Sequence, residues 1–275
     1  MAAVFDAYSK YYDLLYRDKD YAAEAEYVHG LLTRYFAPAG DGITTGGARS
    51  LLELGSGTGR HARLLNQHGY DVQGVERSDT MLARARSLEV PGTVSFQQGD
   101  VRDVRLGRTY DAAISLFHVM SYLPTNADWI AALSTARAHL RPGGLFVFDV
   151  WYGPAVLTDR PTVRVKRMAD EDTEIVRLAE PTLHPNENLV DVAYTVFIRQ
   201  RKTGRVEELG EVHRMRYVFR PEVEQLCDAT GFEVVRAEEW MTGRPAGFDT
   251  WGLCFVARVR SDGVDRMPGA RGADR

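Results

Sequence analysis

The sequence has few cysteines, no excess of basic residues and no long apolar run. Cys227 and Cys254 are the only cysteines among 275 residues, too few for a disulfide framework and without the spacing of metal ligands. The net charge of -4 at pH 7 lacks the basic footprint of a nucleic-acid-binding protein. No stretch reaches the ~18 apolar residues of a membrane span, and Asp6 and Asp13 interrupt the N-terminus where a signal peptide would be apolar. We therefore expect a cytoplasmic protein with no metal and with neither a nucleic-acid nor a membrane partner.

What the chain does have is a regular alternation of short apolar strands and helices between residues 49 and 150. The expected strands are 49–54, 71–76, 93–98, 110–116 and 145–150, and the expected helices are 59–68, one from about 78, and 126–140. Alternation of this kind is typical of a parallel sheet covered by helices on both faces. The pattern predicts an α/β fold.

The segments around this block have different patterns. Residues 1–48 are predicted to be a mainly helical lid, with a loop at 37–48, and 221–260 to supply the last helix and strands of the core. Residues 151–220 read as antiparallel strands, since β-branched and charged residues alternate between turn sequences. The exposed edges of such an insertion favour a homodimer. Residues 261–275 are predicted to be a disordered tail.

A glycine-rich segment, Glu53-Leu-Gly-Ser-Gly-Thr-Gly59, follows the first strand and opens a helix. Glycine lets the backbone turn sharply and approach a ligand, and free N–H groups at a helix start favour an anionic group. Glu76, at the end of the second strand, could accept hydrogen bonds from a ribose diol. Gly99-Asp-Val101, after the third strand, could hold and cover an adenine. Together these motifs predict an adenosine-containing ligand.

With Leu140-Arg-Pro-Gly-Gly144, these motifs resemble class I S-adenosylmethionine methyltransferases over residues 49–150. The resemblance implies a Rossmann-like sheet of seven strands with the last strand antiparallel, an antiparallel β cap inserted after strand five, and S-adenosylmethionine as the cofactor. The residues expected at the cofactor are Tyr12, Tyr16, Tyr21, Glu53, Gly55, Ser56, Gly57, Gly59, Glu76, Met81, Gly99, Asp100, Val101 and Phe117.

A narrower resemblance involves the flanking segments. The tyrosine-rich stretch 11–21 looks like the lid of bacterial methyltransferases that N-methylate nucleotide-linked amino sugars, and the insertion at 151–220 looks like their cap. The chain departs from those enzymes at Tyr122, where they carry a histidine, and around 248–251, where their active-site arginine has no obvious match. We expect a small-molecule acceptor such as a nucleotide-linked amino sugar, and the acceptor atom stays open.

His118 and Tyr122 are the candidate catalytic residues because both follow the fourth strand. An imidazole titrates near pH ~6.5 and can take a proton from the acceptor. Asp149 ends strand five, at the edge where open α/β sheets bind ligands. The residues expected at the acceptor are Asp149, Trp151, Tyr152, His213 and Arg216.

Two other functions fit part of this pattern. A nicotinamide-dependent oxidoreductase shares the glycine loop and the ribose-binding acid, but its fingerprint leaves two residues between the second and third glycines, whereas Gly57 and Gly59 are separated by one. A non-catalytic subunit that binds S-adenosylmethionine would share the whole pattern, because a fold alone does not establish catalysis.

Overall fold

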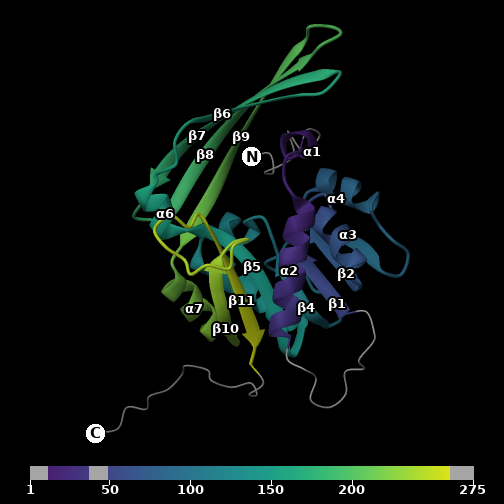
Figure 1. The fold of residues 1–275 in the computed structure, drawn as a ribbon, viewed down its shortest axis with the longest axis vertical. Coiled ribbons are helices and arrows are strands. Elements are labelled where there is room, and N and C mark those ends of the chain that lie inside the picture. Colours follow the sequence, from purple (N-terminus) through teal and green to yellow (C-terminus); the bar gives the residue numbers. More distant parts are fainter. Residues whose placement is uncertain (1–11, 37–48, 261–275) are drawn as a thin grey trace.

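The computed structural model describes residues 12–36 and 49–260, with the side chains of 12 and 13 excepted (Figure 1). The loop and the tail predicted at 37–48 and 261–275 lie outside the described residues. The helices are α1 (Tyr12–Leu15), α2 (Tyr21–Tyr35), α3 (Arg60–Gln67), α4 (Asp79–Arg86), the 3-10 helix η2 (Val119–Tyr122), α5 (Asn126–Ala138), α6 (Gly153–Thr158) and α7 (Arg220–Ala229). The strands are β1 (Arg49–Leu54), β2 (Tyr70–Glu76), β3 (Val94–Gln98), β4 (Tyr110–Ser115), β5 (Leu140–Tyr152), β6 (Arg164–Ala169), β7 (Thr173–His184), β8 (Leu189–Gln200), β9 (Val206–Val218), β10 (Phe232–Glu239) and β11 (Gly252–Val259).

The core is a Rossmann-like sheet in the order β3-β2-β1-β4-β5-β11-β10. The pairings from β3 to β5 are parallel. β11, the last strand of the chain, is antiparallel to both β5 and β10. The predicted α/β class is therefore confirmed. All the parallel strands end at one edge of the sheet, which brings the loops after β1, β2, β3 and β4 together.

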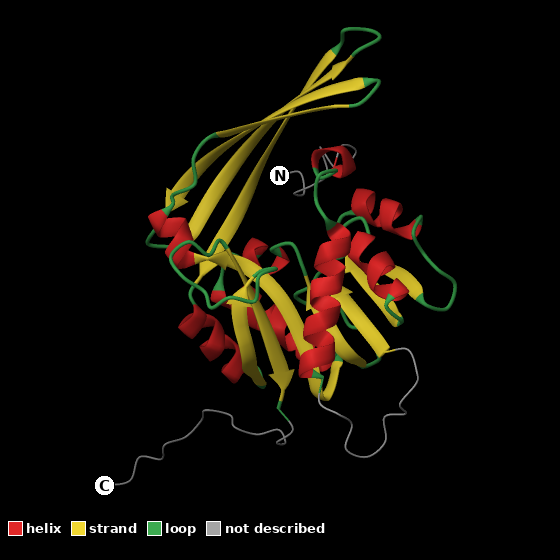
Figure 2. Cartoon of the chain, in the orientation of Figure 1, coloured by secondary structure: helices red, strands yellow, loops and turns green. Residues whose placement is uncertain are grey.

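The strands β6, β7, β8 and β9 form an antiparallel sheet, which we call the cap. It joins the core where β9 pairs with the end of β5, through Trp151↔Tyr217 and Tyr152↔Val218. Figures 1 and 2 show the cap as a long twisted ribbon that rises from the core, with α1 on its inner side. The cap therefore stands over the edge of the core sheet at which the parallel strands end.

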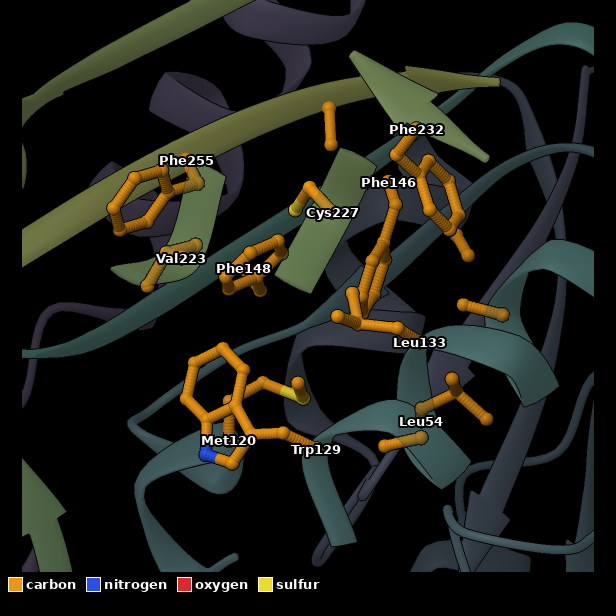
Figure 3. Packing of buried hydrophobic residues seen from close by; sticks show 14 of the residues in the cluster. Leu54, Met120, Trp129, Leu133, Phe146, Phe148, Val223, Cys227, Phe232 and Phe255 are labelled. Atoms are coloured by element: carbon orange, nitrogen blue, oxygen red, sulfur yellow. The ribbon is translucent and has the colours of Figure 1, made fainter. Parts of the chain in front are cut away.

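The central strand β5 is buried on both faces, as expected for a strand covered by helices on each side. Phe146 and Phe148 pack on one face with Trp129, Phe232 and Phe255 (Figure 3). The rings of Phe148 and Phe255 stack with their centroids 5.3 Å apart. Leu145 and Val147, alternating with these residues, belong to the cluster on the opposite face. This packing fixes the end of β5, from which Asp149 and Trp151 project.

Two sequence predictions about element boundaries were wrong. The helix predicted through the lid is interrupted between Leu15 and Tyr21, because Asp20 caps the start of α2 by accepting a hydrogen bond from the backbone N–H of Ala23 at 2.9 Å. The strand expected at 145–150 begins earlier, because Pro142-Gly-Gly144 lies inside β5, where the pairing register with β4 shifts. The interruption at 16–20 matters for function, because these residues lie beside the site described next.

Candidate active site

The glycine loop after β1 depends on glycine at two positions for different steric reasons. Gly55 has φ +79°, and a Cβ there would lie 2.7 Å from Cγ1 of Val119. Gly59 has φ +78°, and a Cβ there would lie 2.6 Å from the ring of Phe96. Both a left-handed backbone and close packing exclude other residues. The loop therefore has a defined shape at the start of α3.

Glu76 fastens the end of β2 to this loop. Its two carboxylate oxygens accept hydrogen bonds from the backbone N–H groups of Gly57 and Ser78, both at 2.8 Å. Burial raises the pKa of Glu76, and these hydrogen bonds partly offset that effect. The carboxylate is thus held at the glycine loop, and its predicted contact with a ribose stays a prediction.

Glu53 is a deeply buried acid of the site, with 1% of its surface exposed. Its Oε2 atom has no hydrogen-bond partner among the described residues, and neither does the buried Oγ atom of Ser56. Burial, together with the nearby Glu76, raises the pKa of Glu53 to about 8. A buried polar atom without a partner is costly, so Glu53 and Ser56 suit a ligand with hydrogen-bond donors such as an ammonium group.

A chain of ionisable groups, which sequence reasoning missed, links Glu53 to the N-terminal segment. Nε2 of His61 lies 2.7 Å from Oε2 of Glu24, and Nδ1 of His61 lies 3.8 Å from Oε1 of Glu53. Lys19 forms an ion pair with Glu24. Burial would raise the pKa of Glu24, but His61 and Lys19 together lower it. The spacing of these residues along the sequence gave no signal, because they meet only when α2 packs on α3.

The N-terminal aromatics lie close to the loop after β4. The ring of Tyr16 meets that of Phe117 edge to face at 5.1 Å, and Nζ of Lys19 lies 4.1 Å from the centre of the Phe117 ring. Tyr21 lies 5.0 Å from the ring of His61. The side chain of Tyr12 lies outside the described residues. Tyr16 and Tyr21 are therefore placed where they could cover a cofactor, which stays a prediction.

Asp100 is already engaged by a neighbouring cation. Nε and Nη2 of Arg102 donate to its carboxylate at 2.9 and 2.7 Å, and this pairing lowers the pKa of Asp100. Gly99 is confined, since a Cβ there would lie 2.7 Å from Val104. Val101 packs against the core and Met81 is buried beside Leu15. A ligand that uses Asp100 has to share it with Arg102, so its predicted contact with adenine stays a prediction.

The turn after β4 is strained and held by one acid. Phe117 and His118 both have left-handed backbones, with φ +65° and +62°, a conformation that costs non-glycine residues about 1–3 kcal/mol each. The backbone N–H of His118 donates to both oxygens of Asp149 at 3.1 and 3.2 Å, and Nδ1 of its ring lies 2.7 Å from Oδ2 in an ion-pair contact without hydrogen-bond alignment. Asp149, expected at the acceptor, is 1% exposed and holds the turn through the backbone of His118. Its contact with the acceptor stays a prediction.

A cavity of about 380 Å³ opens between this turn and the cap. His118 and Trp151 line it from the core. Arg164, Lys166 and Arg177 line it from β6 and β7, and no acidic residue is among the described residues of its wall. Sequence reasoning missed these cations, although Arg164 and Lys166 occupy alternate positions that must share one face of β6. The cavity can accept a molecule with an anionic part.

Three other residues expected at the site do not line this cavity. Tyr152 packs against the core, and His213 is 2% exposed, with Nδ1 2.8 Å from the hydroxyl of Tyr122. The guanidinium of Arg216 donates to Oδ1 of Asn126 at 2.5 Å and pairs with Glu222. Arg216 thus ties the base of the cap to α5 and α7. Acceptor contacts for these residues, and catalysis by Tyr122, stay predictions.

Comparison with known proteins identifies the class. A family model described as a methyltransferase domain matches residues 51–144. The chain is 32% identical over 239 residues to the dTDP-3-amino-3,4,6-trideoxy-alpha-D-glucopyranose N,N-dimethyltransferase of Streptomyces venezuelae, covering 86% of this chain and 92% of the relative. It is 31% identical to the dTDP-3-amino-3,6-dideoxy-alpha-D-glucopyranose N,N-dimethyltransferase of Streptomyces fradiae, covering 86% of each. The chain therefore belongs to the S-adenosylmethionine-dependent methyltransferases, in the group that contains these two enzymes.

A solved structure agrees with this assignment. The S-adenosylmethionine-bound amino pentose methyltransferase of Micromonospora echinaspora superposes with a TM-score of 0.68 at 28% identity, covering 88% of this chain and 92% of that one. The predicted enzyme class and cofactor are confirmed, and the nicotinamide-dependent and non-catalytic alternatives are not favoured. No described helix is both long and apolar enough to cross a membrane.

Proposed function

We propose that this enzyme methylates the amino group of a nucleotide-linked sugar. The observation that carries the proposal is the cavity with His118 at one end and Arg164, Lys166 and Arg177 along its wall. Three cations on a wall whose described lining residues include no acid suit the diphosphate of a nucleotide sugar, because arginine and lysine are the usual partners of phosphate oxygens. Lys166 also contacts Asp18 at 3.7 Å. The acceptors in the names of the two Streptomyces relatives and the amino pentose of the solved structure support the same class.

The domain boundaries acquire a role in this proposal. Residues 49–150 and 221–260 hold the cofactor, residues 151–220 enclose the acceptor, and the described part of the lid, residues 12–36, covers both. Cap and core meet at the cavity, where Trp151 and Trp251 pack edge to face with centroids 6.0 Å apart. Flat aromatic walls suit the faces of a sugar and a base.

Within the site, the residues of this chain orient the acceptor, exclude water and accept one proton from the acceptor. S-adenosylmethionine supplies a sulfonium methyl that is already activated, so positioning contributes most of the remaining rate enhancement. Asp149 fixes the His118 backbone and lies beside its Nδ1 atom. This arrangement favours a proton on Nδ1 and leaves Nε2 to accept a proton from the acceptor amine.

The test is a methyl-transfer assay with the purified enzyme, S-adenosylmethionine and a panel of dTDP-linked sugars. The panel contains 3-amino and 4-amino sugars and the matching 3-hydroxy and 4-hydroxy sugars, and mass spectrometry detects the added methyl groups. We expect methylation of an amino sugar and none of its hydroxyl counterpart. Methylation of only the hydroxyl sugars, or of amines without a nucleotide, would contradict the proposal.

We also propose that the enzyme acts in the cytoplasm as a homodimer formed through the cap. β6 lies at the end of the sheet order, and Val163 and Val165 beside its open edge are 62% and 49% exposed. Exposed apolar edges tend to be covered. Both cysteines are free, which suits a reducing compartment. Light scattering should give a dimer for the wild type and a monomer for Val165→Lys, and a monomeric wild type would exclude the dimer.

A further inference from the structure

A hydrogen-bonded chain runs from the cap to the 3-10 helix beside the cavity. On β9, Glu211 and His213 lie two residues apart and therefore on the same face of the strand. Oε2 of Glu211 lies 3.0 Å from Nε2 of His213, and Nδ1 of the same ring lies 2.8 Å from the hydroxyl oxygen of Tyr122 on η2. His213 is 2% exposed, and the side chain of Glu211 is 6% exposed. Three polar side chains are thus connected in series away from bulk water.

The carboxylate of Glu211 sets the direction in which hydrogen is donated along the series Glu211–His213–Tyr122. An ionised carboxylate can only accept hydrogen bonds, so Nε2 of His213 has to carry a hydrogen to bond Glu211. In a neutral imidazole, Nδ1 is then an acceptor, and the hydroxyl of Tyr122 has to donate to it. The hydrogen of the phenol is therefore directed at His213.

The neighbours of Tyr122 come from the cavity wall and from the N-terminal segment. Tyr194 lies opposite Glu211 across the β8–β9 pairing, and its ring contacts His213 edge to face at 4.7 Å. Tyr194 and Arg177 line the cavity, and the guanidinium of Arg177 lies 4.8 Å over the ring of Tyr194. Tyr16, which packs on Phe117, is close enough to influence the ionisation of Tyr122. Tyr122 is thus linked through His213 to Tyr194 of the cavity wall.

The buried environment of Tyr122 determines the protonation state of its phenol. Burial raises the pKa of Tyr122 well above its usual value, and Tyr16, Tyr194 and Glu211 act in the same direction. The hydroxyl stays protonated at neutral pH and does not act as a base. A protonated phenol whose hydrogen is already used can still accept a hydrogen bond through its oxygen.

We propose that Glu211 and His213 are positioning residues that make the oxygen of Tyr122 a hydrogen-bond acceptor for an N–H of the acceptor amine. No covalent bond is made or broken in this interaction. It constrains the direction of the nitrogen lone pair, which is what an in-line reaction requires. The amine itself rests on the proposed function, whereas the orientation of the chain Glu211–His213–Tyr122 does not.

The first experiment measures that orientation without any acceptor. Nitrogen-15 NMR of histidine-labelled full-length protein at pH ~7.5, compared with His213→Phe to assign the signals, reports which ring nitrogen of His213 carries hydrogen. We expect the Nε2–H tautomer in the wild type and a mixture of tautomers in Glu211→Gln, because a glutamine amide can also present its NH₂ group. An Nδ1–H tautomer or an imidazolium in the wild type would overturn the proposal.

The second experiment measures turnover with the amino sugar that the wild type methylates. Tyr122→Phe should lower kcat by about 30-fold and Glu211→Gln by about fivefold, each with an unchanged KM for S-adenosylmethionine, because losing or misdirecting one hydrogen bond has effects of this size. Glu211→Asp should recover part of the loss. Glu208→Gln, on the same strand and exposed, is the matched control and should behave as wild type.

The outcomes separate the two proposals. Folded Tyr122→Phe with kcat within twofold of wild type would overturn the positioning role, and thermal unfolding curves establish that the variant is folded. A wild-type enzyme that methylates no amine would instead overturn the proposed function. The NMR result would then still decide whether His213 directs the hydroxyl of Tyr122.

Discussion

The two halves of the active site are built in different ways. The cofactor half uses backbone turns at the ends of successive strands, with glycines at 55 and 59 that no other residue can replace without strain or collision. The acceptor half uses side chains from β5, β6, β7 and β8 that meet only when the cap stands over the core. The first half is a local property of the sequence and the second is a tertiary one. The acceptor half can therefore change without disturbing the cofactor half.

The halves also differ in their ionisable groups. Glu53, Glu76 and Asp100 lie on the loops where we expect the sulfonium and ammonium of the cofactor. Arg164 and Lys166 line the acceptor cavity. The turn at Phe117 and His118 separates the two. This division predicts that substitutions in one half change the binding of one substrate only, and five experiments test or sharpen it.

The largest expected effect is at the glycine loop. Gly55→Ala places a Cβ 2.7 Å from Val119 at φ +79°, and the left-handed backbone alone costs a non-glycine residue roughly 1–2 kcal/mol. We expect calorimetry to show S-adenosylmethionine binding weakened by about 100-fold or more. Gly57→Ala, at φ +55° with no atom within 4 Å of the new Cβ, is the control and should lose much less. Equal losses would mean that the contact with Val119 is unimportant.

The next effect is on turnover. His118→Asn retains the backbone N–H that Asp149 binds, and asparagine tolerates the left-handed conformation. Removing the imidazole should lower kcat by roughly 100-fold if it is the general base, with S-adenosylmethionine affinity unchanged. His68→Asn at the end of α3 is the control. An unchanged kcat would remove His118 from proton transfer.

A smaller effect is expected at the cap. Arg164→Gln removes one cation from the cavity wall and should raise KM for the nucleotide sugar about tenfold, the usual scale for one charge-assisted hydrogen bond. Arg167→Gln is the matched control, because position 167 is exposed and alternates with 164 and 166 on the same strand. A loss of S-adenosylmethionine affinity in Arg164→Gln would break the division between the halves.

This division explains how much the sequence could predict. The sheet, the glycine loop and the place of Glu76 follow from periodicity and from spacing within about 60 residues. The break before α2 was also readable, since Asp20 precedes Tyr21-Ala-Ala-Glu24 as a capping residue. The partners of Asp149 and Arg216 were not readable. The neighbouring sequence does not distinguish an acid that contacts the acceptor from an acid that holds His118. It also does not distinguish an arginine in the cavity from an arginine paired with Glu222.

The smallest expected effect is a change in the pH dependence of stability, which tests the raised pKa of Glu53. Burial raises this pKa from 4.5 to about 8, so between those values the folded protein holds a proton that the unfolded chain has lost. The free energy of unfolding should therefore fall as pH rises from 4.5 to 8. Glu53→Gln, which stays neutral, should not show this part of the decrease in chemical denaturation at pH 5 and 8. Identical slopes in both proteins would mean that Glu53 is ionised when folded.

The same group predicts proton release on cofactor binding. If the ammonium of S-adenosylmethionine lies beside Glu53, it favours the carboxylate, and the proton held at pH 7 has to leave. Calorimetry in two buffers of different ionisation enthalpy should detect release of up to about one proton per cofactor in the wild type and less in Glu53→Gln. Glu76→Gln should bind more weakly and release only part of this proton, because the charge of Glu76 contributes to the raised pKa of Glu53 while burial remains the larger cause. If the proton release disappears only in Glu76→Gln, the acid beside the ammonium group is Glu76 and not Glu53. The contrast between the cofactor half and the cationic cap would then be unchanged.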